Sequence, residues 1–168
     1  MNRRYDQYLV KKYSPLYEQR HSDIRHTAMC WGFEVGNGWF SLIDQLSYAL
    51  CSKWLRAKQE YEYIKDREGE LQFTCFTPSE FNQTITTAMI EEAKQLMIAE
   101  EAKVPKAIQV KEKYGTLRFY VYGATDQQQN YIDFAESMSS RICELCGKPG
   151  KRNQWGWLTT ACKEHRSS

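Results

Sequence analysis

Two pairs of metal-ligating side chains near the C-terminus constrain the fold of this chain more than any other feature. Cys143 and Cys146 are separated by two residues, as are Cys162 and His165, and fifteen residues lie between the pairs. Thiolate and imidazole are the ligands that zinc prefers, and a structural zinc site needs four of them in a tetrahedron. Gly147 allows a tight turn after the first pair, and the intervening segment is long enough for a hairpin that delivers the second. The sequence therefore predicts one structural zinc ion in a zinc-ribbon or treble-clef-like module.

The same ligand set argues against catalysis at the metal. Four protein ligands close the coordination shell, whereas a catalytic zinc keeps one position open for water or substrate. A variant in which His165 leaves the metal stays open, although no sequence feature favours it. The other two histidines, His21 and His26, lie in a polar segment, and no Ser/His/Asp or Cys/His dyad can be assembled. Glu144, between two ligands, is expected to face solvent. We therefore expect a protein that is not an enzyme.

Basic residues are concentrated in the C-terminal module. From Arg141 onward the chain has six Lys and Arg against two Glu, whereas the preceding residues have 17 basic against 19 acidic side chains. A small positive module can contact phosphates, but the same charges also fit a solvated surface around a thiolate site. Two tryptophans of the module can stack on bases, or one can fill its small core. The candidate contact residues for a nucleic acid or a protein partner are Arg141, Lys148, Lys151, Arg152, Trp155, Trp157, Lys163 and Arg166.

Length and composition indicate an α+β protein in two parts. The 168 residues suffice for a body over residues 1–140 and a zinc-binding module over residues 141–168. No apolar run approaches the roughly 20 residues that span a bilayer, and the N-terminus lacks the apolar stretch of a signal peptide. We therefore expect a cytosolic protein with no membrane partner. Cys30, Cys51 and Cys75 are an odd set, which favours reduced, mostly buried thiols over a disulfide framework.

Apolar periodicity predicts that the body is mainly helical. The helix nearest the C-terminus is expected to be capped by Asp126. Its inward face is expected to comprise Tyr131, Ile132, Phe134, Ala135 and Met138. The expected helices cover residues 3–12, 41–66 and 127–140.

A further helix has a marked start. Thr77 and Glu80 have the spacing of a capping box, and Pro78 occupies the first helical position. This helix is expected to continue to about residue 102. A short strand is expected before it, over residues 71–76.

The clearest β pattern is a hairpin over residues 108–122. Apolar and polar side chains alternate in its second strand, the period of a half-buried strand. Lys111, Lys113 and Arg118 would lie on this hairpin. Together with Tyr120 they form either a stacking and phosphate-contact surface or an ordinary solvated face.

Residues 29–40, MCWGFEVGNGWF, are called the Gly-rich block below. Its three glycines and Asn37 demand turns with positive φ or the close approach of another backbone. An aromatic-packed corner that sets the angle of the following helix is the favoured interpretation. The alternative is phosphate binding on backbone N–H groups, although the block lacks the Lys and Ser/Thr of a P-loop.

Four stretches of the sequence resemble a family of small bacteriophage proteins. They are MCWGFEVGNGWFSLIDQL, VKEKYGTLRFYVYG, YIDFAESMS and CELCGKPGKRNQWGWLTTACKEH. In that family a Trp-Gly-rich block, a KEK(F/Y)GTLRFY hairpin and a C-terminal Cys/His module occur in this order. The resemblance covers nearly the whole chain and implies a phage or prophage origin, action in the host cytoplasm and metal binding at the four predicted ligands, but no activity. Val35 and Asn37 stand where Cys and Asp are more usual, which argues against a second metal site in the Gly-rich block.

Two binding functions follow from these patterns. A metal-stapled, aromatic-rich scaffold without a catalytic constellation fits an inhibitor or adaptor that binds a host or phage protein, with Trp and Tyr as anchors; such a protein can act in counter-defence or host takeover. The alternative is a protein that binds DNA or RNA through its basic module. The low overall charge counts against tight nonspecific nucleic-acid binding.

Overall fold

The computed structural model describes residues 1–72 and 83–166, and its contacts divide the chain into two compact units. Unit 1 comprises Met1–Cys51 and Val104–Ser168, and unit 2 comprises Ser52–Lys103. The fold is α+β, as the sequence predicted. The C-terminal module shares unit 1 with the first 51 residues, whereas the central unit 2 was not foreseen. The predicted capping box of Thr77 and Glu80, with Pro78, lies outside the described residues, as does Cys75.

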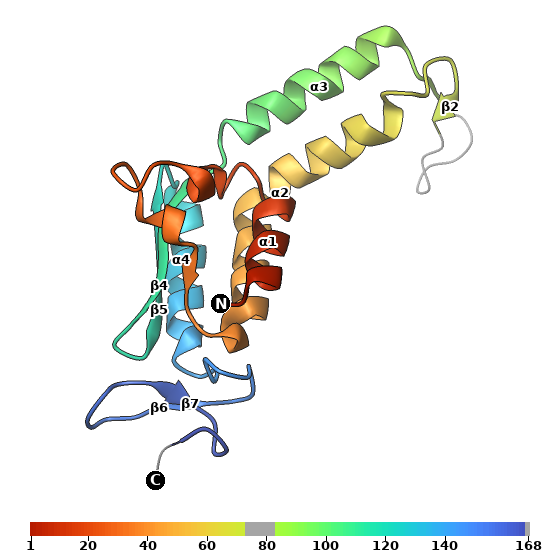
Figure 1. Ribbon diagram of the computed structural model, residues 1–168. Coiled ribbons are helices and arrows are strands. Elements are labelled where there is room, and N and C mark those ends of the chain that lie inside the picture. The colour runs from red at the N-terminus through yellow and green to blue at the C-terminus, as the bar shows by residue number, and fades with distance from the viewer. Residues whose placement is uncertain (73–82, 167–168) are drawn as a thin grey trace. The chain divides into compact units, whose positions relative to one another are not determined.

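The sheet of unit 1 has three strands in the order β1-β4-β5. β1 (Phe33–Glu34) is parallel to β4 (Lys106–Lys113), and β5 (Thr116–Tyr122) is antiparallel to it (Figure 1). This confirms the predicted hairpin. Side chains of helix α4 (Asp126–Ser139) accept hydrogen bonds from two backbone N–H groups on the outer edge of β5. Ser139 Oγ accepts from Leu117 N at 2.9 Å, and Glu136 Oε1 accepts from Phe119 N at 2.8 Å. These two backbone donors of the edge strand are therefore not free to pair with another strand.

Helices α1 (Arg3–Lys12) and α2 (Phe40–Ile64) follow the predicted ranges closely. Asn2 caps α1 by accepting from Tyr5 N at 2.9 Å, which satisfies one of the orphan donors of the first turn. The core of unit 1 is formed by side chains of α1, the start of α2, the sheet and α4. Its largest fully buried members include Leu9, Tyr13, Tyr17, Trp39, Ile43, Val110, Leu117 and Ile132.

Helix α4 differs from the prediction in its cap and in its inward face. Thr125, not Asp126, is the N-cap, and its side chain forms a capping box with Gln128. Tyr131 and Phe134 were expected to face inward, but both are exposed. Ile132 and Ala135 are buried, as predicted, and Ser139 is buried with them; these residues lie three and four positions apart, on one face of the helix.

Unit 2 contains the remainder of α2, the helix α3 (Thr87–Glu101) and a two-stranded sheet of β2 (Leu71–Gln72) and β3 (Gln83–Thr84). The predicted helix was expected to include residues 83–86, but β3 occupies the first two of these. Thr86 is the N-cap of α3 and accepts from Met89 N at 3.3 Å. Tertiary pairing therefore overrides the periodicity before Thr87. No helix in the described part of the chain has the length and apolar character needed to cross a membrane.

Candidate metal centre

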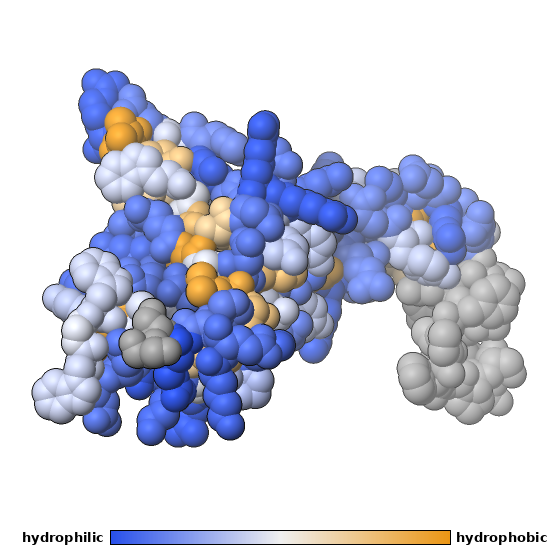
Figure 2. All heavy atoms as spheres, turned by 60° about the horizontal axis from the view of Figure 1, so that its bottom comes forward, coloured by the Kyte–Doolittle hydropathy of each residue, from blue (hydrophilic) through white to orange (hydrophobic). Residues whose placement is uncertain are grey.

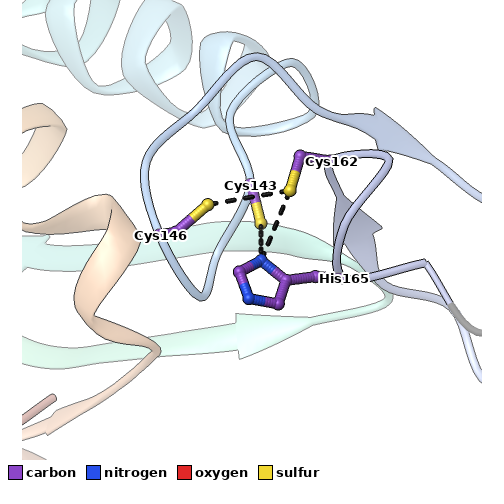
Figure 3. Close-up of side chains that lie close together, drawn as sticks. All are labelled: Cys143, Cys146, Cys162 and His165. Carbon is purple, nitrogen blue, oxygen red and sulfur yellow. Dashed lines mark hydrogen bonds between the residues drawn. The ribbon is translucent and has the colours of Figure 1, made fainter.

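Four side chains from two loops converge near the C-terminus. Cys162 Sγ lies 3.7 Å from Cys146 Sγ and 3.3 Å from His165 Nδ1, and Cys143 Sγ lies 3.5 Å from the same nitrogen (Figure 3). All four ligand atoms lie within 4.8 Å of one another. The sulfurs are too far apart for a disulfide, whose S–S bond is about 2.05 Å. The structure thus brings together all four predicted ligands in an arrangement that can hold one metal ion.

Two tight turns aim these ligands. In the first loop Gly147, at φ +78°, donates its N–H to Cys143 O at 2.8 Å, and Cys143 N donates to Lys148 O at 2.8 Å. A positive φ of this kind favours glycine, as the sequence indicated. In the second loop His165 N donates to Cys162 O at 3.2 Å. The hairpin expected between the pairs is present: β6 (Lys151–Arg152) pairs antiparallel with β7 (Thr160–Ala161).

The surroundings of Cys143 favour its thiolate form. Burial alone would raise the pKa of this thiol, but backbone N–H groups of Cys162, Cys146 and Leu145 donate to it, and His165 lies beside it. The net effect lowers the pKa of Cys143 to about 6. Hydrogen bonds to the charged form stabilise that form, and the thiolate is the form of cysteine that binds metal.

The Gly-rich block is the surface against which the first metal-binding loop packs. The sequence predicted turns or close backbone approach at its glycines, but not that the metal-binding loop would be the partner. Gly38 N donates to Glu144 O at 2.7 Å, and Trp39 Nε1 donates to Ile142 O at 2.8 Å. A Cβ on Gly38 would lie 2.7 Å from Cys146 N and closer still to Cys143 O. Two backbones can approach this closely only where one residue has no side chain. The block is thus a docking surface for the metal loop as well as the start of α2.

Glu144 was expected to face solvent, and this is wrong. It is half-buried, and its Oε1 accepts from Gly36 N at 2.8 Å. Burial raises the pKa of its carboxyl group, and the Gly36 hydrogen bond acts in the opposite direction. The backbone donors of Gly36 and Gly38 are therefore taken by Glu144, which contradicts the alternative of a phosphate site in the Gly-rich block.

Neither tryptophan of the module fills a core. Trp155 is 85% and Trp157 is 84% exposed. The loop that carries them is fixed by Asn153, whose Nδ2 donates to the carbonyl oxygens of both, at 3.1 and 2.9 Å, and whose Oδ1 accepts from Thr159 N at 2.8 Å. Asn153 was not singled out in the sequence, and its place in a polar loop gave no signal beyond turn propensity. The buried core of the module is formed by Cys143, Ala161 and Cys162.

The basic candidate residues all lie on the surface, but they differ in their partners. Lys148 pairs with Glu164 at 2.7 Å. Arg152 Nε donates to Tyr114 O at 2.5 Å, so its side chain links the module to the β4–β5 turn. Lys151 precedes it on β6. Arg141, Lys151, Lys163 and Arg166 are exposed and take part in no ion pair among the described residues.

No protein-family model, curated protein or solved structure matches the chain.

Proposed function

We propose that this chain is a zinc-stapled recognition protein, in which one structural zinc ion builds a C-terminal module that binds another macromolecule. The observation that carries the metal assignment is the set of distances between the donors. Zinc bonds of about 2.3 Å to sulfur and about 2.0 Å to nitrogen predict tetrahedral edges of about 3.8 Å between sulfurs and about 3.5 Å between sulfur and nitrogen. The corresponding distances of 3.7, 3.3 and 3.5 Å agree with this single ion.

The donor chemistry supports the same choice. Three cysteine sulfurs and one imidazole are soft and borderline ligands, which suit zinc better than magnesium or calcium. Four protein donors leave no open coordination position, so the proposed zinc stabilises the fold and catalyses nothing.

The recognition role is supported by the loop of residues 153–159. Two neighbouring tryptophans are more than four-fifths exposed on a loop that Asn153 holds in place. Exposed aromatic side chains on a rigid support are typical binding anchors, because little conformational entropy is lost when they are covered. The resemblance to bacteriophage proteins leads us to propose that the partner is a host or phage macromolecule in the bacterial cytoplasm, either a protein or a nucleic acid.

Metal analysis and hydrogen exchange test this proposal. Purified protein is expected to contain one zinc per chain, and Cys143→Ser is expected to lose it, because binding at such a site is coupled to folding. Chelation of the metal is expected to speed amide exchange at Gly36 and Gly38, which are distant in sequence but bonded to Glu144. Stoichiometric zinc in Cys143→Ser would remove the metal assignment.

A further inference from the structure

The tip of the β4–β5 hairpin docks on the C-terminal module and leaves a groove beside it. Thr160 Oγ1 donates to Gly115 O at 2.6 Å, and Arg152 Nε donates to Tyr114 O at 2.5 Å. A Cβ on Gly115 would lie 3.1 Å from Thr159 N, so the turn is seated closely on the loop before β7. The groove has a volume of about 470 Å³ and is lined by Glu112, Lys113, Tyr114, Gly156, Trp157 and Leu158.

Aromatic rings stand at the rim of this groove. Trp157 and Tyr114 line the groove and are 84% and 60% exposed. Trp155 lies on the same loop as Trp157. Asn153 fixes the loop from one side, and the docked turn fixes Tyr114 from the other. The backbone that carries each ring is therefore fixed by a hydrogen bond, and both rings are exposed, so that a planar ligand can reach them.

Tyr114 occupies a backbone conformation that tyrosine rarely adopts. Its φ is +55° and that of Gly115 is +78°, which are the signs of a type I′ turn, where Asn-Gly is the preferred pair. A non-glycine residue in this region costs about 1–2 kcal/mol. Retained strain of this kind is found at functional sites, and here it accompanies an exposed ring at the groove.

One cation lines the groove, Lys113, and two more, Lys151 and Arg152, form the strand β6 of the same module. Lys113, Lys151 and Arg152 are exposed, and none of them forms an ion pair with a described residue. The one carboxylate of the lining, Glu112, accepts from Gly115 N at 2.5 Å and so is turned toward the backbone of the turn. The groove therefore combines open aromatic faces with unneutralised positive charge.

The positive charge continues along the sheet. The β4–β5 register places Lys111 directly opposite Arg118, on the same face as Lys113. Like charges in this position destabilise a sheet. Arg118 is compensated by Glu136 at 3.3 Å, whereas the Lys111 ammonium lies 5.9 Å from the centre of the Tyr120 ring and has no ion pair among the described residues. A bound polyanion would relieve this repulsion.

We propose that this groove binds single-stranded nucleic acid, with bases stacked on Tyr114 and Trp157 and phosphates on Lys113, Lys111 and Arg152. The proposal rests on the recognition role given above and names its partner. Stacking on aromatic rings beside a cationic track is how single strands are bound without sequence readout, whereas the bases of a duplex are already stacked on one another. A protein partner is less well matched, because interface cores are depleted in lysine.

Figure 2 is turned so that the C-terminal module, at the bottom of Figure 1, faces the viewer. Hydrophilic side chains predominate there, with near-white ones protruding among them. Arg152 stands at the border with a neighbouring cleft that it lines together with Asp133 and Glu136. Beyond Arg152 these two carboxylates would repel a phosphate backbone. A bound strand is therefore expected to leave the groove on the side of Lys113.

Fluorescence anisotropy with labelled oligonucleotides tests the proposal on zinc-loaded, full-length protein. The probes are single-stranded DNA and RNA of roughly 12 nucleotides, within the site sizes of known single-strand binders, and the corresponding duplexes. We expect the single strands to bind more tightly than the duplexes. If three cations contact phosphates, the logarithm of the binding constant is expected to fall with the logarithm of the salt concentration, with a slope of about −2. Trp157→Ala is expected to weaken binding roughly 5- to 150-fold, the effect of removing one stacking ring.

Matched variants separate the groove from general surface effects. Trp31→Ala removes a tryptophan that is 58% exposed but does not line the groove, and Lys94→Ala removes a lysine of helix α3 that is paired with Glu91; neither is expected to change affinity. Tyr114→Asn relieves the backbone strain and removes the ring, so it is expected to retain stability and lose affinity. Equal losses in Trp31→Ala and Trp157→Ala, or duplexes bound as tightly as single strands, would overturn the proposal.

Two results separate the nucleic-acid assignment of the groove from the metal assignment of the module. Zinc-loaded, folded protein that binds no single strand at low salt overturns the nucleic-acid assignment and leaves a protein partner as the recognition target. Protein that contains no zinc and keeps its fold contradicts the metal-stapled module itself.

Discussion

Substitution of Gly38 by alanine tests how the metal loop is attached to the body of unit 1. The added Cβ would lie 2.7 Å from Cys146 N and nearer still to Cys143 O, whereas ordinary contacts are about 3.5–4.0 Å. Both neighbours are backbone atoms of a loop that is closed by its own hydrogen bonds, so neither can rotate away. The loop must therefore move off the Gly-rich block.

The expected loss of folding free energy follows from the hydrogen bonds that this movement breaks. Gly38 N–Glu144 O and Trp39 Nε1–Ile142 O are neutral hydrogen bonds, and Gly36 N–Glu144 Oε1 has a carboxylate acceptor. Net values of about 0.5–1.5 kcal/mol for each neutral bond and about 1.5–3 kcal/mol for the charged one give a loss of about 2.5–6 kcal/mol. This is a large part of the roughly 5–15 kcal/mol that stabilises a typical domain.

Urea unfolding of zinc-loaded protein measures this loss. The four ligands are untouched, so Gly38→Ala is expected to keep its zinc stoichiometry while its unfolding midpoint falls. Gly123→Ala is the reference for a glycine substitution without a clash, because no atom lies within 4 Å of an added Cβ there. Its cost is the strain of its positive φ of +78°, about 1–2 kcal/mol, a strain that Gly38, whose φ is not positive, does not have. Gly38→Ala is therefore expected to cost more than Gly123→Ala through the clash alone. A Gly38→Ala protein as stable as the wild type would refute the docking of the metal loop on the Gly-rich block.

Two further substitutions probe unit 1 away from the metal. Burial raises the pKa of the Cys51 thiol to about 12 from an ordinary value of 9.0, so the protonated form stabilises the fold below pH 9 and this contribution falls as the pH rises toward 12; the stability difference between wild type and Cys51→Ala, from urea midpoints at neutral and alkaline pH, is expected to shrink accordingly. Ser139→Ala leaves Leu117 N of the edge strand without its acceptor and is expected to cost about 1–3 kcal/mol in thermal unfolding. Ser140→Ala, which removes a solvent-exposed bond to Ser137 O, is the matched control and is expected to cost much less.

The metal ligands could be predicted from the sequence because their geometry is local. The spacing of two residues within each pair places both ligands on one turn, and Gly147 supplies the positive φ that the first turn needs. The β4–β5 hairpin, expected over residues 108–122, and the helices α1, α2 and α4 could be predicted for a similar reason, since each has its own apolar period.

The packing of the metal-binding loop on the Gly-rich block could not be predicted, because it joins segments that lie more than 100 residues apart in the sequence. Gly36 and Gly38 were recognised as positions that need unusual backbone, but glycine gives no sign of whether it serves a turn, a ligand or another backbone. Glu144 was read as exposed for the same reason. Its partner, the Gly36 amide, lies 108 positions away.

The tryptophan loop shows a different limit of sequence reading. A small metal module needs some apolar side chains, and periodicity cannot say which of them lie inside when the loop has no regular period. Here Ala161 and two cysteine ligands occupy the interior. Trp155 and Trp157 are therefore left outside, which is the observation that turns the module from a purely structural element into a candidate binding surface.

The proposed zinc and the proposed groove are physically linked. The loop that presents Trp157 begins and ends at the β6–β7 hairpin, and Cys162 follows directly after β7. Thr160 on β7 holds the hairpin tip through Gly115 O. The free energy of structural zinc binding, about 10–16 kcal/mol in small zinc modules, is as large as the whole stability of a typical domain. Loss of the metal should therefore release β7 from its position and open the groove, so zinc-depleted protein should lose the binding surface while α1 and the β4–β5 sheet stay folded on the core of unit 1.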